Sequence, residues 1–177
     1  MKRTFVFAIA LALSLPFLTA ACGSGDTPNT PSPSGTATFM ATLRPSEETP
    51  PVTGAEAAGT GTVNITLNTT RDSSSNVTAA TATFAVNVNG FPAGMPVNMA
   101  HIHQAAVGQS GNVVVNTSLA PGDVTLANGA GSFTRSGIDV TPDLANQILA
   151  NPSGFYFNIH STLNPAGVAR GQLVRAQ

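Results

Sequence analysis

Apolar and polar side chains alternate with a period of two through most of the chain after position 36, and this pattern constrains the fold most. In residues 61–67 the alternation puts Val63, Ile65 and Leu67 on one face. Residues 81–88 repeat it with Phe84, Val86 and Val88. Successive side chains of a strand point to opposite faces, so both segments read as half-buried strands. Turn-like segments separate further short strands, expected at residues 38–43, 99–103, 113–115, 131–134, 155–160 and 168–174.

One segment departs from the alternation and reads as a short helix. Thr141, Pro142 and Asp143 match an N-cap, a first-turn proline and a first-turn acid, and Asn151-Pro152 ends the pattern. Short, evenly spaced strands are typical of sandwiches and barrels rather than of α/β folds. We therefore predict an all-β fold, an antiparallel Greek-key-like sandwich of about eight strands with one short inserted helix.

The first 21 residues read as a targeting segment. Lys2 and Arg3 precede an apolar run over residues 5–18, which is shorter than the roughly 20 residues of a membrane span. The following Leu18-Thr19-Ala20-Ala21-Cys22 resembles the lipobox of bacterial lipoproteins, with Thr19 where that signal more often has Leu or Val. We predict a lipoprotein signal peptide over residues 1–21; an ordinary secretory signal or a transmembrane anchor is the alternative.

Cys22 is the only cysteine, which excludes an intramolecular disulfide and leaves no thiolate for a metal or a nucleophile. A lipid attached to Cys22 explains a lone thiol in an exported protein. Residues 22–35 hold three prolines and no large apolar side chain after the cysteine, so they are predicted to be a disordered tether. Residues 36–177 remain as one sandwich domain.

The charge of the mature chain argues against nucleic acid as a partner. Removal of residues 1–21 takes away Lys2 and Arg3 and leaves five arginines against eight acidic residues, a net charge of −3. Nucleic-acid binding depends on clustered Lys and Arg. The expected partners are instead the membrane, through the N-terminal lipid, and an envelope or extracellular protein.

The three histidines form the best candidate site. His101 and His103 must point to the same face of their strand, and His160 ends a second, similar strand. Three imidazoles suit copper, zinc or nickel, and the thioether of Met99, on the same face as His101, favours copper and particularly Cu(I). Two alternatives stay open: a structural cluster, in which backbone carbonyls or Asn158 hold the histidines, and a small-molecule or glycan site.

The chain resembles the CHRD domain, named for chordin and found in many bacterial exported proteins. The motifs that carry this likeness are Glu48-Thr49-Pro50-Pro51-Val52, Ala100-His101-Ile102-His103, Val113-Val114, Tyr156-Phe157-Asn158-Ile159-His160-Ser161, Asn164-Pro165-Ala166-Gly167 and Arg170-Gly171-Gln172-Leu173. The resemblance implies an extracytoplasmic β-sandwich and no established reaction.

Three positions depart from the family pattern. Gln104-Ala105-Ala106 replaces the usual Gly-Pro-Ala, and Ser161 replaces a threonine. Val168-Ala169 stands where an acidic residue is expected before Arg170. If that acid normally pairs with the arginine, Arg170 must find another partner here, near the histidines or among loop carbonyls.

The His-x-His strand also resembles the copper-ligand strand of copper/zinc superoxide dismutases. Three histidines and one cysteine cannot build that binuclear site, and no Gly-x-Ser-x-Gly elbow or phosphate-binding glycine loop is present. We therefore expect a lipid-anchored, non-enzymatic binding domain on the bacterial cell envelope, periplasmic or at the cell surface, holding one copper-type ion. The alternatives are a structural or adhesive module and an oxidoreductase with a mononuclear copper.

Overall fold

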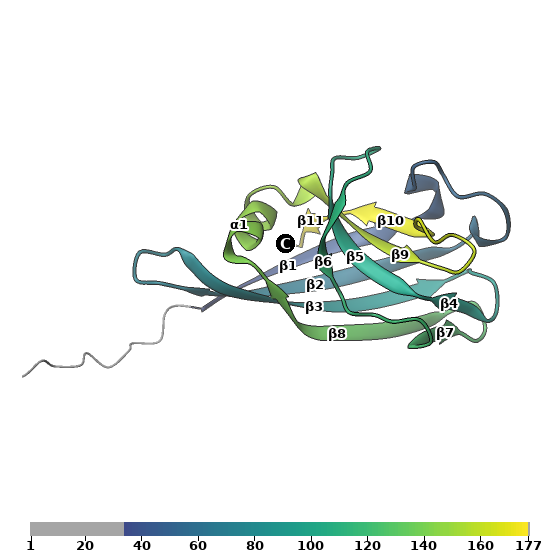
Figure 1. The fold of residues 1–177 in the computed structure, drawn as a ribbon, viewed down its shortest axis with the longest axis horizontal. Coiled ribbons are helices and arrows are strands. Elements are labelled where there is room, and N and C mark those ends of the chain that lie inside the picture. Colours follow the sequence, from purple (N-terminus) through teal and green to yellow (C-terminus); the bar gives the residue numbers. More distant parts are fainter. Residues whose placement is uncertain (1–33, 177) are drawn as a thin grey trace, which may run out of the picture. The chain divides into compact units, whose positions relative to one another are not determined.

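The computed structural model describes residues 34–176, which form two antiparallel sheets and a short ribbon (Figure 1). The five-stranded sheet has the order β11-β1-β2-β3-β8, the four-stranded sheet the order β10-β9-β5-β6, and β4 pairs with β7. The strands of the first sheet are β1 (Ser34–Leu43), β2 (Thr60–Arg71), β3 (Val77–Asn89), β8 (Gly131–Val140) and β11 (Val174–Arg175). Those of the second are β5 (Met99–Gln104), β6 (Asn112–Asn116), β9 (Phe155–His160) and β10 (Ala169–Gln172). The ribbon consists of β4 (Met95–Val97) and β7 (Val124–Leu126).

The predicted all-β sandwich with one helix is confirmed. The described residues hold eleven strands rather than about eight, because β4 and β7 have only three residues each and residues 168–174 divide at Leu173 into β10 and β11. The chain leaves one sheet between β3 and β5 and returns between β6 and β8, so that β8 lies beside β3 and β9 beside β5. β1 begins at Ser34, two residues before the predicted start of the domain.

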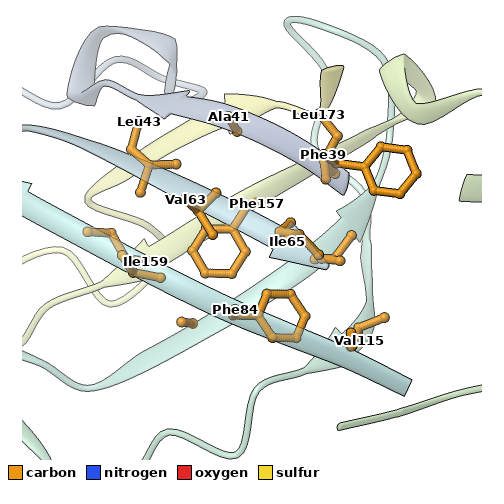
Figure 2. Packing of buried hydrophobic residues seen from close by; sticks show 14 of the residues in the cluster. Phe39, Ala41, Leu43, Val63, Ile65, Phe84, Val115, Phe157, Ile159 and Leu173 are labelled. Carbon is orange, nitrogen blue, oxygen red and sulfur yellow. The ribbon is translucent and has the colours of Figure 1, made fainter. Parts of the chain in front are cut away.

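The core lies between the sheets, where the alternating positions of the long strands meet those of β5 and β9. All six inward-facing side chains predicted from residues 61–67 and 81–88 are buried. Phe84 of β3 and Phe157 of β9 stack across the two sheets, with ring centroids 5.7 Å apart and planes at 26° (Figure 2). This contact between residues distant in sequence fixes which face of β9 points away from the core.

Helix α1 (Pro142–Ala150) follows β8 and packs on the core through Ala145 and Ile148. The Thr141 hydroxyl accepts a hydrogen bond from the Leu144 amide at 3.4 Å, so the predicted N-cap is confirmed. Three short 3-10 helices lie in the connections: η1 (Pro45–Glu47), η2 (Gly54–Glu56) and η3 (Pro152–Gly154). None of the helices within residues 34–176 has the length and apolar character needed to cross a membrane.

The two sheets join along one edge, where β1 meets β10. The backbones of Arg44 and Arg170 exchange hydrogen bonds of 2.9 and 3.3 Å. The residue after Arg170 must be glycine, because a Cβ on Gly171 would lie 2.1 Å from the Thr42 carbonyl oxygen. This close approach places the Arg170 side chain on the outer face of the four-stranded sheet.

The predicted signal peptide (residues 1–21), the lipidated Cys22 and most of the tether fall outside the described residues. These three assignments stay predictions.

Candidate metal centre

The outer face of the four-stranded sheet carries a row of buried polar side chains. The register between β5 and β9 pairs Met99 with His160, His101 with Asn158, and His103 with Tyr156. Directly paired residues of an antiparallel sheet share a face. The same row continues into β10, where Arg170 pairs with Asn158. Loops cover this face, so the polar side chains are buried although they point away from the core.

The structure brings the three predicted histidines together. His101, His103 and His160 are 5–8% exposed, and one ring nitrogen from each lies within 4.8 Å of the others. His101 Nδ1 and His160 Nε2 are 3.2 Å apart. Zn–N bonds of about 2.0–2.1 Å in a tetrahedral site put neighbouring ligand nitrogens roughly 3.3 Å apart. The distance between these two nitrogens thus fits either a hydrogen bond between the rings or two ligands of one ion.

Backbone carbonyls orient two of the rings. His103 Nδ1 lies 3.0 Å from the Gly111 carbonyl oxygen, and His160 Nδ1 lies 3.0 Å from that of Pro165. A carbonyl only accepts, so each Nδ1 carries the proton and each Nε2 is unprotonated. The Nε2 atom of His103 is buried and has no hydrogen-bond partner, whereas that of His160 faces His101 Nδ1. Histidines that donate from one ring nitrogen to a carbonyl and keep the other unprotonated are the usual arrangement of metal ligands.

Comparison with known proteins assigns the family. A family model described as the CHRD domain matches residues 39–173. The chain belongs to the CHRD domain family. No curated protein and no solved structure matches it. The CHRD match begins at Phe39 and ends at Leu173, both fully buried, and it includes all three histidines. The likeness of one strand to copper/zinc superoxide dismutases stays an interpretation of that strand.

The histidines of this CHRD domain are held neutral. Burial, reinforced by the charges of His160 and His103, lowers the pKa of His101 from 6.5 to about 4. Burial is also the main cause that lowers the pKa of His103 and of His160, although the carbonyl bonds oppose it. Metal ions bind imidazole in its neutral form. The cluster therefore presents its ligands ready for a cation at neutral pH.

The free energy of unfolding without metal should fall as the pH is lowered from about 6.5 to about 4. Because the folded-state pKa values are depressed, the three histidines bind protons in the unfolded chain at a pH where they stay neutral in the folded protein. For His101 alone, this difference lowers the free energy of unfolding by about 3 kcal/mol. The raised pKa of Glu48 increases the free energy of unfolding as the pH falls from about 7 to 4.5, but this is one group and the histidines are three. Urea unfolding in EDTA at pH 7, 6 and 5 measures the slope. Glu48→Gln should steepen it, and stability that rises on acidification would contradict the expectation.

Arg170 finds partners on three loops. Its Nη1 donates to the Gln109 carbonyl at 3.0 Å, its Nε to the Glu47 carbonyl and its Nη2 to the Thr49 hydroxyl. The predicted contact with loop carbonyls is thus present. The nearest carboxylate is Glu48, with Oε2 3.9 Å from Arg170 Nε. Glu48, from a distant loop, therefore provides the acid that is absent at Val168-Ala169.

Tyr156 links Arg170 to the histidines, and the sequence analysis missed its role. The guanidinium carbon lies 4.7 Å from the centre of the Tyr156 ring. The Tyr156 ring also stacks on the ring of His103, with centroids 4.8 Å apart and an angle of 4° between the planes. The Tyr156 hydroxyl also accepts from the Gly111 amide at 3.4 Å. The alternation within residues 155–160 already placed Tyr156 on the face of Asn158 and could have indicated it.

Glu48 is the most perturbed acid of the site. Burial raises its pKa to about 7, against the opposing charge of Arg170. Its Oε1 atom is buried and has no hydrogen-bond partner, and a Cβ on Gly167 would lie 2.8 Å from both carboxylate oxygens. At neutral pH the group thus holds its proton part of the time.

Met99 and Asn158 differ in how closely they join the cluster. Met99 lies opposite His160 and is 36% exposed, on the face predicted for it, and its role as a ligand stays a prediction. Asn158 is buried, yet its Oδ1 has no hydrogen-bond partner. Of the two structural partners predicted for the histidines, backbone carbonyls are the ones observed.

Proposed function

We propose that this CHRD domain binds a single copper-type metal ion through His101, His103 and His160. The observation that carries the proposal is the pair of carbonyl bonds that leave the Nε2 atoms of His103 and His160 unprotonated beside His101. Three neutral imidazoles provide a nitrogen-rich site, and the thioether of Met99 at its edge favours copper, and Cu(I) in particular, over zinc. The function is binding, without a catalytic step.

The location of the domain is part of the same proposal. The N-terminal segment with Cys22 supports export and lipid anchoring to the bacterial cell envelope, in the periplasm or at the cell surface. The anchored domain would meet metal ions and an envelope or extracellular protein there. Membrane fractionation of cells that express the full chain or Cys22→Ser tests the anchor; equal retention of both proteins in the membrane would refute it.

Titration of the metal-free protein with Cu(I), Cu(II) and Zn(II) tests the site. We expect one ion per chain, and at a free metal concentration 100 times Kd the free energy of unfolding should rise by about 2.7 kcal/mol. His103→Ala should abolish saturable binding. Met99→Leu should weaken Cu(I) and leave Zn(II) binding unchanged, because only the soft ion gains from the thioether. Absence of saturable binding at micromolar metal concentrations would refute the proposal.

A specific contact favours a second function. The 3.2 Å contact between His101 and His160 joins β5 to β9 without any ion, which is what a structural or adhesive module would require of its histidines. In that case His101→Ala and His160→Ala would each lower the free energy of unfolding, and the loss would be the same with and without added metal.

A further inference from the structure

Glu56 is a buried carboxylate with no role so far, and its contacts lead to His160. It ends helix η2 and is 3% exposed. Its Oε2 atom accepts a hydrogen bond from the Ser161 hydroxyl at 2.7 Å and another from the Asn164 side-chain amide. Both donors belong to the loop that directly follows His160 on β9, more than 100 residues away in sequence.

The same loop supplies the carbonyl that orients His160. Ser161 Oγ also accepts from the Asn164 backbone amide at 2.9 Å, and the Gly167 amide donates to the Asn164 carbonyl at 3.1 Å. These bonds fold the loop into a turn whose next residue, Pro165, presents its carbonyl to His160 Nδ1. Three links therefore join the carboxylate to the ring: the hydrogen bond from Asn164 to Glu56, the peptide bond from Asn164 to Pro165, and the contact of the Pro165 carbonyl with His160 Nδ1.

Apolar packing does not hold this loop in place. Thr162, Leu163, Pro165 and Ala166 are exposed, and Leu163 is 65% exposed. Two side chains from other segments anchor the loop: Glu56, on the buried side, and Asn98, whose Nδ2 donates to the Thr162 hydroxyl at 3.0 Å on the exposed side. Glu56 is the buried one of the two and accepts two hydrogen bonds from the turn that carries the Pro165 carbonyl.

We infer that Glu56 is a positioning residue of the metal site, which fixes the tautomer and orientation of His160 through the Ser161–Pro165 loop. The expected effect on metal affinity rests on the proposed metal function. The expected effect on the tautomer and orientation of His160 does not. Groups that orient ligands from outside the coordination sphere typically change metal affinity 10- to 100-fold. The two effects can be measured separately.

The experiment compares Glu56→Ala and Glu56→Gln in the full chain. Nitrogen-15 NMR of the metal-free protein reads the tautomer of each histidine. We expect the Nδ1–H form of His160 in the wild type and a mixture of tautomers in Glu56→Ala, with His103 unchanged because Gly111 holds it independently. Glutamine keeps an oxygen acceptor, so Glu56→Gln should retain the wild-type tautomer. Zn(II) and Cu(I) affinities should fall 10- to 100-fold in Glu56→Ala and remain near wild type in Glu56→Gln.

Two further variants keep the test decisive. Thr162→Val removes the exposed anchor of the same loop and should change neither the tautomer nor the affinity. Asn164→Ala, at a half-buried position, removes one of the two Glu56 contacts and should shift the tautomer in the same direction if Glu56→Ala fails to fold. A wild-type tautomer of His160 in Glu56→Ala, or in Asn164→Ala where that is the folded variant, overturns the inference. If the wild type binds no metal, the proposed function fails while the NMR comparison still decides the role of Glu56.

Discussion

Replacement of Arg170 with methionine should lower the free energy of unfolding by about 3–5 kcal/mol, the usual cost of removing one partner of a buried ion pair. Arg170 is 4% exposed, and its guanidinium donates to carbonyls of Glu47 and Gln109 and to the Thr49 hydroxyl. Methionine fills the volume of the stem but leaves these buried acceptors without a donor. It also leaves Glu48 without the nearby positive charge.

Urea unfolding of Arg170→Met measures this loss, and the matched control is Arg135→Met. Arg135 also pairs with a carboxylate, that of Asp123, but the two side chains are 29% and 40% exposed, against 5% and 7% for Arg170 and Glu48, so this change should cost only about 0–1 kcal/mol. Adding Glu48→Gln to Arg170→Met should recover part of the stability, because the double variant no longer buries an unpaired acid. Equal losses in the two arginine variants would contradict the buried network.

Phe157→Ala should cost about 3–5 kcal/mol as well, through a different mechanism. The side chain is fully buried and stacks on Phe84, so its removal opens a cavity between the two sheets. Phe157→Leu, which retains most of the apolar volume, should cost clearly less. Chemical denaturation of the three proteins gives the comparison.

The partner residue sharpens this measurement. A double-mutant cycle with Phe84→Ala should show a coupling of about 0.5–1.5 kcal/mol, the range for stacked aromatic pairs. Additive losses at the two positions would mean that the stacking adds nothing to the burial of each ring.

The sequence predicted the faces of the strands better than their partners. Val63, Ile65 and Leu67 lie inward because a strict period of two determines the face of every residue once the segment is a strand. The same rule put His101 and His103 together. Their meeting with His160 depends on the register between β5 and β9, which no local pattern contains. Convergence of the three rings was therefore only a hypothesis until the fold was known.

One residue of the site and two strands outside it could not be found from local patterns. Glu48 approaches Arg170 because β1 and β10 meet at one edge, a contact between opposite ends of the domain. Strands β4 and β7 were missed because three residues are too few to show a period, and Pro96 within β4 argues against a strand. Short and non-local features are the ones that tertiary packing decides.

The hydrogen bonds that enclose the site join segments far apart in the chain. Arg170 and Glu47 are 123 residues apart, and Glu56 and Asn164 are 108. The chain loses entropy when it closes loops of this length, before the contacts that stabilise the fold can form. Folds dominated by such distant pairings take milliseconds to seconds to form. The histidine cluster therefore needs β9, whose last residue is His160, to be synthesised and paired with β5: a chain that ends before β9 carries only two of the three imidazoles.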